Sequence, residues 1–232
     1  MSYYLSVIIF FLLSLFVHRT LKNKLRNGSK IISSSHMSGE EIAKKMLNDY
    51  SIDDVNVLCT EEEFSDHYNP LDKTINLSQK VFYSKDLTSL AIASHESAHA
   101  IQHKNGYELL KMRNHLVPIL NFSSRFVNLA ILSGLSIFYH SSGRESMILK
   151  LGIGLFFLVI LFSLITLPIE FNASKRALFW IRNKKIANSK EDMKIKEYLT
   201  WAAMTYVIST LGSIIEFTYF ISFFHNRHSD KE

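Results

Sequence analysis

The chain has 232 residues, of which 47% are hydrophobic and 12% aromatic, and this composition excludes a disordered chain. Its net charge is +5, but the Lys and Arg residues flank apolar segments without interleaved aromatic residues, which argues against a nucleic-acid-binding module. A single cysteine, Cys59, excludes a disulfide within the chain. The apolar residues form four long runs separated by charged stretches, a pattern typical of a protein that crosses a membrane several times.

The first apolar run extends from Tyr3 to Val17 and has about the length of a signal-peptide core. No basic region precedes it, no small-residue cleavage site follows it, and a basic stretch begins directly after it at Arg19. These flanks favour a retained anchor with its N-terminus outside. We therefore predict an N-terminal transmembrane anchor over residues 1–18.

Residues 19–115 are rich in charge and are predicted to form a soluble domain of mixed α and β structure. Ser38, followed three positions later by Glu41, is a capping box, the pattern that opens a helix. Asn105-Gly106 is a helix stop, and Asn69-Pro70 marks a turn between two short strands. The elements expected are helices over 39–50 and 87–104 and strands over 55–60 and 73–78.

Three further apolar runs cover 116–138, 147–168 and 200–224, and each exceeds the roughly 20 residues that a helix needs to cross a bilayer. The run 116–138 is the weakest of them, because Arg125 interrupts it. We predict that Arg125 pairs with Glu216, or that the two line a polar cavity, since both are ionisable groups within spans. Region 116–224 is thus expected to hold three transmembrane helices, followed by a tail over 225–232.

The basic residues indicate how the spans are oriented. Residues 19–115 carry 13 Lys and Arg and residues 169–199 carry 8, whereas residues 139–146 carry one and the tail after Phe224 carries two. Because basic loops stay on the cytoplasmic side, 19–115 and 169–199 are predicted inside, and 139–146 and both termini outside. The topology therefore places the soluble domain and segment 169–199 on the same side of the membrane.

His95-Glu96-Ser97-Ala98-His99 is an HExxH motif on the predicted helix 87–104. A spacing of four residues puts both imidazoles on one helix face, where both can bind the same zinc ion. Glu96 lies beside them and can take a proton from water that the zinc has made more acidic. The helix is expected to carry two metal ligands, His95 and His99, and a catalytic base, Glu96.

A catalytic zinc needs a third protein ligand and an open fourth position. Asn105 stands where the metzincin pattern has its third histidine, and His103 lies two turns from His95, too far to close a tetrahedron easily. An acidic residue from a second helix is the remaining arrangement. Glu170, two residues after Pro168, is the best candidate, and Ser174 one turn later could hydrogen-bond a ligating imidazole.

Further residues are candidates for binding the substrate or the oxyanion that forms during hydrolysis. His67, Tyr68 and Arg176 could each donate a hydrogen bond or a positive charge to that oxyanion. The strand Lys73 to Ser78 could form an exposed sheet edge to which an extended peptide adds as another strand. A purely structural role is the alternative for all of these positions.

Several separate motifs follow one another over roughly half of the chain: Asp66 to Pro70, Ile75 to Ser78, His95 to Gln102, Gly106-Tyr107, Leu116 to Pro118 and Glu170 to Ala177. With these motifs the chain resembles the YugP-like family of neutral zinc metallopeptidases, a family similar to HtpX-like membrane proteases. The resemblance implies zinc as the cofactor, with His95, His99 and Glu170 as its ligands and Glu96 as the base. Ser97 stands where the family usually has glycine, and Asn69 and Asn172 stand where it has aspartate.

Together these features predict an α-helical membrane protein with a small α+β, zincin-like domain that carries the HExxH helix. The expected function is a zinc endopeptidase that cleaves proteins or peptides at the cytoplasmic face and contacts membrane lipid. The Lys, Asn, Ile and Ser content is typical of an AT-rich bacterial genome, so we expect a bacterial inner membrane. An intramembrane protease is less favoured, because Lys85, Asp86 and Lys104 border the HExxH helix. A non-enzymatic membrane scaffold that keeps a metal site is the main alternative.

Overall fold

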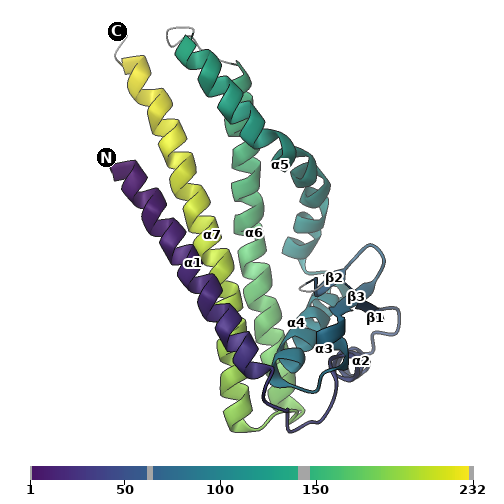
Figure 1. Cartoon of the computed structure of the whole chain (residues 1–232). Coiled ribbons are helices and arrows are strands. Elements are labelled where there is room, and N and C mark those ends of the chain that lie inside the picture. Colours follow the sequence, from purple (N-terminus) through teal and green to yellow (C-terminus); the bar gives the residue numbers. More distant parts are fainter. Residues whose placement is uncertain (1, 62–64, 141–146, 230–232) are drawn as a thin grey trace. The chain divides into compact units, whose positions relative to one another are not determined.

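The computed structural model describes residues 2–61, 65–140 and 147–229, which are mostly helical (Figure 1). The chain divides into two compact units, described separately below. The helical unit comprises Met1–Leu15, Met112–Leu167 and Tyr206–Glu232, and the mixed unit comprises Phe16–Lys111 and Pro168–Thr205. The elements are α1 (Ser2–Gly28), α2 (Gly39–Asp49), β1 (Asn56–Thr60), β2 (His67–Asn69), β3 (Thr74–Ser78), α3 (Gln79–Tyr83), α4 (Leu87–Lys104), α5 (Glu108–His140), α6 (Met147–Asn183) and α7 (Ser189–Ser229).

Among the residues that the structure describes, three helices are long and apolar enough to cross a membrane. They cover Leu5–Gly28 in α1, Met147–Asn183 in α6 and Ser189–Ser222 in α7, so the first, third and fourth predicted spans lie in such helices. The predicted span 116–138 lies in α5, which is not among the candidates within the described residues, and it stays a prediction. The predicted pairing of Arg125 also stays untested, because its side chain is outside the described part of the chain.

The helical unit has an apolar core of its own. Its buried residues are Val127 and Ile131 from α5 and Phe156 and Ile160 from α6. A Cβ atom added at Gly134 would lie 2.7 Å from the backbone of Leu149. The glycine therefore permits close approach of α5 and α6, as small residues do between membrane helices.

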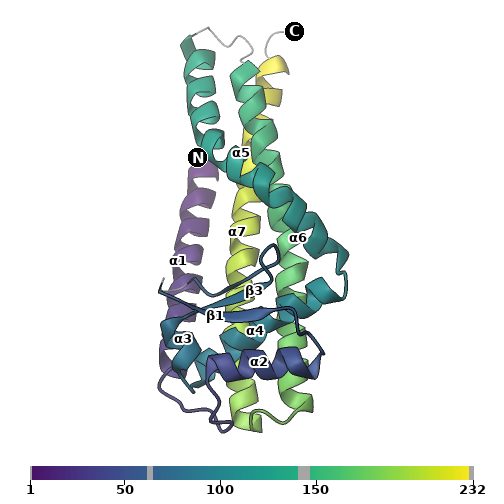
Figure 2. The same ribbon diagram turned by 90° about the vertical axis from the view of Figure 1, so that its right-hand side faces the viewer.

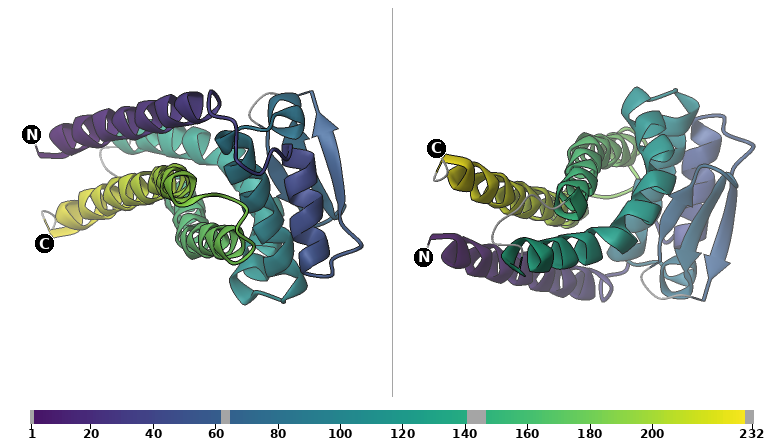
Figure 3. Two further views of the ribbon diagram at one scale, coloured as in Figure 1. Left: turned by 90° about the horizontal axis from the view of Figure 1, so that it is seen from below. Right: turned by 90° about the horizontal axis from the view of Figure 1, so that it is seen from above.

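The sheet of the mixed unit has the strand order β1-β3-β2. β1 pairs with β3 in parallel and β2 pairs with β3 antiparallel, and helices α2 and α4 cover one face of the sheet (Figures 2 and 3). The expectation that 73–78 forms an exposed edge is wrong, because β3 lies between the other two strands. Strand β2 has only three residues and ends at the predicted turn Asn69-Pro70, so the sequence did not indicate it. It forms an edge of the sheet and contacts α4.

Local capping signals set the helices of this unit. Ser38 and Glu41 form the predicted capping box of α2, with Ser38 Oγ accepting from the Glu41 amide at 3.3 Å and Glu41 Oε2 accepting from the Ser38 amide at 2.7 Å. The side chain of Asp86 caps α4, accepting from the Ser89 amide at 2.9 Å. Both helices therefore begin where side-chain oxygens satisfy their free N–H groups.

The core of the mixed unit joins the sheet, α2, α4 and the parts of α6 and α7 that belong to the unit. Trp180 of α6 is its largest fully buried side chain, and its indole N–H donates to Asp49 Oδ2 at the end of α2, at 2.8 Å. Other fully buried members are Ile42, Met46, Ile75, Leu77, Leu90, Ile101, Ile181 and Ile195. Trp180 thus holds α6 against the helix layer on which the sheet rests.

We expect Trp180→Ala to destabilise the protein by about 3–5 kcal/mol, because it leaves a cavity and removes the bond to Asp49. The measurement is thermal unfolding of the purified protein in detergent. Phe179→Ala is the control, since this neighbouring side chain is 60% exposed. Equal losses of stability in the two variants would contradict the assigned core.

Candidate metal centre

Helix α4 supplies the two histidines of the HExxH motif. His95 and His99 lie one turn apart, with ring centroids 4.9 Å apart and ring planes perpendicular. Their side chains are only 14% and 8% exposed. The same helix has small buried residues, among them Ala91, Ala98 and Ala100. These small side chains let neighbouring elements approach the histidines closely.

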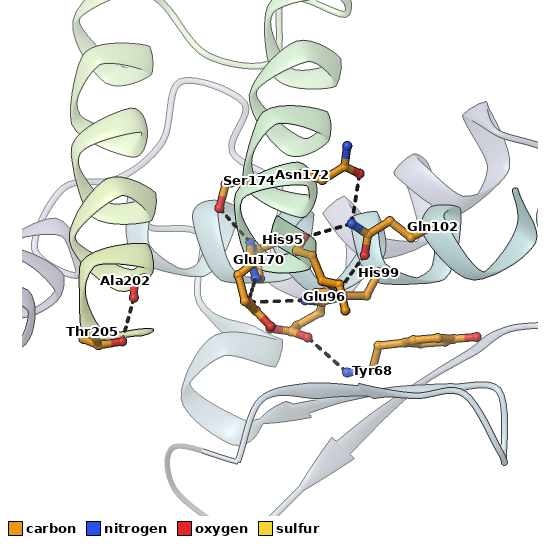
Figure 4. Close-up of polar contacts among 11 residues, drawn as sticks. Tyr68, His95, Glu96, His99, Gln102, Glu170, Asn172, Ser174, Ala202 and Thr205 are labelled. Carbon is orange, nitrogen blue, oxygen red and sulfur yellow. Dashed lines mark hydrogen bonds and ion pairs between the residues drawn. The ribbon is translucent and has the colours of Figure 1, made fainter. Parts of the chain in front are cut away.

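Glu170 of α6 meets both imidazoles (Figure 4). Its Oε2 lies 3.2 Å from His95 Nε2 and 3.7 Å from His99 Nε2, and its side chain is 5% exposed. The potential ligand atoms of the three residues all lie within 4.8 Å of one another. The structure therefore brings together the three residues that the sequence suggested as ligands, across a separation of 75 positions.

This arrangement fits a zinc ion. Zinc binds imidazole nitrogen and carboxylate oxygen at about 2.0–2.2 Å in a tetrahedron, whose corners are then about 3.4 Å apart. The distances of 3.2 and 3.7 Å from Glu170 to the two histidines lie on either side of that value. Two imidazoles and one carboxylate are also a ligand set that catalytic zinc sites use, with the fourth corner left for water or substrate.

Glu96 lies next to the three candidate ligands, but its hydrogen bond is made to strand β2. Its Oε2 accepts a hydrogen bond from the backbone amide of Tyr68 in β2 at 3.0 Å (Figure 4). Burial raises the pKa of Glu96 to about 7; the neighbouring His95 opposes this shift and the negative charge of Glu170 adds to it. A carboxyl group with a pKa near neutrality is suited to exchanging protons with water.

Comparison with known proteins agrees with the site. Residues 3–225 match the protein family described as "Putative neutral zinc metallopeptidase". The chain belongs to this family. It is also 35% identical, over 214 residues, to the "Putative membrane protease YugP" of Bacillus subtilis (strain 168), a match that covers 92% of each chain. No solved structure matches the chain at a significant level.

In this member of the metallopeptidase family, a fully buried glutamine, Gln102, connects the two helices that supply the candidate metal ligands. Gln102 Oε1 accepts from His99 Nδ1 at 2.9 Å, and Gln102 Nε2 donates to the Ile169 carbonyl and to Asn172 Oδ1, both at 2.9 Å. A proton on Nδ1 leaves the Nε2 lone pair of His99 free for a metal. One side chain therefore sets the tautomer of His99 and ties it to the backbone next to Glu170.

Ser174 occupies the corresponding place beside the other histidine. Its hydroxyl lies 3.4 Å from His95 Nδ1, which is the contact that its position one turn after Glu170 suggested. The Nε2 atom of His95 then faces Glu170, 3.2 Å away. Both imidazoles thus have Nδ1 engaged by a polar side chain and present Nε2 to the same point.

The three residues suggested for the oxyanion have other partners in the structure. His67 is exposed and its Nδ1 contacts the Ser65 carbonyl, while Arg176 Nε donates to Asn172 Oδ1 at 2.7 Å. Tyr68 contributes its amide to Glu96, and its hydroxyl bonds to His103 Nδ1 at 2.7 Å. Roles for these residues in binding the oxyanion stay predictions.

The roles of Gln102 and of the Tyr68 amide were not predicted from the sequence. Gln102 stands three residues after His99, a spacing at which helical side chains meet. That signal could have identified Gln102 from the sequence. Nothing in the sequence indicates the Tyr68 amide, because it is a backbone group placed by the sheet.

We expect Gln102→Leu to weaken zinc binding by about 10–100-fold, because it releases the ring of His99 and its link to α6. Competition between the purified protein and a fluorescent zinc chelator measures this affinity. Gln79→Leu is the matched control, since Gln79 is exposed at the start of α3 and should bind zinc normally. An unchanged affinity in Gln102→Leu would show that the glutamine does not position a ligand.

Proposed function

We propose that the protein is a zinc-dependent endopeptidase, embedded in a bacterial inner membrane, that hydrolyses peptide bonds at the cytoplasmic face. The observation that carries this proposal is the convergence of His95, His99 and Glu170 beside an unligated glutamate, Glu96. Family membership and the similarity to a protein described as a membrane protease support it. The substrate is a protein or peptide, including segments of membrane proteins.

The ion would be held by His95, His99 and Glu170. Because these side chains are largely buried, bulk water would not reach the ion from the three directions that they occupy. A bound zinc ion supplies Lewis acidity, which polarises the scissile carbonyl and makes a water molecule a better nucleophile. The buried Gln102 keeps His99 in the tautomer that binds metal, because its amide oxygen can only accept from Nδ1. The hydroxyl of Ser174 lies 3.4 Å from His95 Nδ1, where it can accept a hydrogen bond that favours the same tautomer. The ligands are therefore arranged in advance, which reduces the cost of organising the site during the reaction.

Glu96 is the general base in this proposal. The Tyr68 amide holds its Oε2, so we assign Oε1 as the atom that accepts the proton of the attacking water. Glu96 then returns this proton to the nitrogen of the leaving amine, which completes the hydrolysis. A backbone donor suits this purpose because it fixes the carboxylate without competing for the proton.

Glu96→Gln separates catalysis from metal binding. The variant keeps the size of the side chain and can still accept from the Tyr68 amide, but it cannot take a proton from water. We expect zinc content to be unchanged and cleavage of an unfolded protein substrate to fall by about 10²–10⁴-fold. Unaltered cleavage would reject the mechanism, and absence of cleavage in the zinc-loaded wild type would favour the scaffold alternative.

The proposed cytoplasmic orientation rests on the basic residues of 19–115 and 169–199. Cys59, the single cysteine of the chain, is exposed on β1 and serves as a natural reporter. In intact cells we expect a membrane-impermeant maleimide to leave Cys59 unlabelled, and permeabilised cells to show labelling. Cys59→Ser is the control for labelling of other reactive groups. Equal labelling of intact and permeabilised cells would show that the topology is opposite to the one proposed.

A further inference from the structure

A cavity lies in the mixed unit next to the candidate metal centre. Its volume is about 330 Å³, and it is bounded by the segment between α2 and β1, by β2, by the turn into β3 and by the last turns of α4. Ile52, Val55 and Ala100 supply apolar wall. This is room enough for one amino-acid side chain or the end of a peptide, and the proposed catalytic mechanism does not use it.

The rim of this cavity is more positive than negative. Lys73 is paired with Asp54, so these two charges balance each other. The ammonium of Lys104 instead donates to the carbonyls of Tyr50 and Ser51, at 2.7 Å each, and within the described residues it has no carboxylate partner. Main-chain carbonyls hold Lys104 in place without neutralising it, so one full positive charge remains at the rim.

Tyr68 and His103 connect the cavity with the metal centre. Both line the cavity, and their side chains are joined by a hydrogen bond of 2.7 Å. His103 stands one turn after the metal-ligand candidate His99, while the backbone amide of Tyr68 binds the proposed base, Glu96. A peptide that reaches the metal centre along β2 would therefore also pass the mouth of the cavity.

We propose that this cavity is a substrate subsite that binds a carboxylate, with Lys104 as its main cationic partner. The assignment rests on the proposed peptidase function and adds a preference for acidic substrates to it. The carboxylate comes either from a Glu or Asp side chain or from the C-terminus of the substrate. Apolar contacts with Ile52 and Val55 receive the carbon atoms that carry the carboxylate.

The position of the cavity sets the distance between this carboxylate and the bond that is cut. Four residues of helix, from His99 to His103, advance about 6 Å, and an extended peptide advances about 3.3 Å per residue. The residue that fills the cavity therefore lies about two positions from the scissile bond. The same spacing makes the preference local: acidic residues elsewhere in the peptide have no partner in this cavity.

Two sets of quenched fluorescent peptides test the assignment with the zinc-loaded, full-length protein in detergent. The first set has amidated C-termini and replaces Gln by Glu at one position at a time around the cleavage site. The second set has no acidic side chain and compares a free with an amidated C-terminus. We expect kcat/KM to rise about fivefold when the carboxylate is two residues from the scissile bond, as for a partly exposed ion pair.

Variants identify the cavity as the source of this preference. Lys104→Met should abolish it, whereas Asp54→Asn should increase it by releasing Lys73 from its ion pair. The control is Lys44→Met, because Lys44 is 61% exposed on α2 and does not line the cavity. Asp54 is 65% exposed, so Asp54→Asn remains informative even if Lys104→Met proves poorly folded.

The outcomes separate the two proposals. A preference seen only in the second set assigns the carboxylate to the C-terminus of the substrate, and one seen in the first set assigns it to a side chain. Cleavage without any carboxylate preference, or with a preference that neither Lys104→Met nor Asp54→Asn alters, overturns the subsite and leaves the peptidase intact. Failure of the wild type to cleave any peptide beyond the level of Glu96→Gln rejects the peptidase, and the subsite with it.

Discussion

A buried carboxylate between two imidazoles is the constraint on which the rest of the structure depends. The side chain of Glu170 is 5% exposed and lies 3.2 and 3.7 Å from His95 and His99. Burying a carboxylate away from water costs several kcal/mol unless charge and hydrogen bonds compensate for it. A divalent cation shared with the two histidines would provide that compensation.

The surrounding fold keeps α4 and α6 at the distance that this contact requires. Small buried residues along α4 permit the approach, Gln102 links His99 to the backbone at Ile169, and Trp180 anchors α6 to the end of α2. The sheet acts from the other side of the HExxH helix, where the amide of Tyr68 fixes Glu96. Helix α4 carries both histidines and Glu96, but the candidate ligands are oriented from α6 and the proposed base from the sheet, so Glu96 can be altered without disturbing the contacts of the histidines.

Local patterns in the sequence predicted the parts of the fold that depend on neighbouring residues. The capping box at Ser38 predicted the start of α2, and Asn105-Gly106 predicted the end of α4, because such start and stop signals act over three or four positions. The edge position expected for strand 73–78 was wrong, since the central place of β3 depends on β2, a three-residue strand without a hydrophobic pattern. Glu170 was suggested by its position after Pro168 and by family resemblance, but its approach to the histidines is a tertiary contact that only the structure reveals.

The metal content of the purified, full-length protein tests the central claim most directly. The account predicts about one zinc ion per chain in the wild type, because the folded ligand set is complete without a partner. His99→Ala and Glu170→Ala should each lose most of this zinc while remaining folded in detergent. Zinc retained at the wild-type level in Glu170→Ala would show that the carboxylate is not a ligand and would contradict the account.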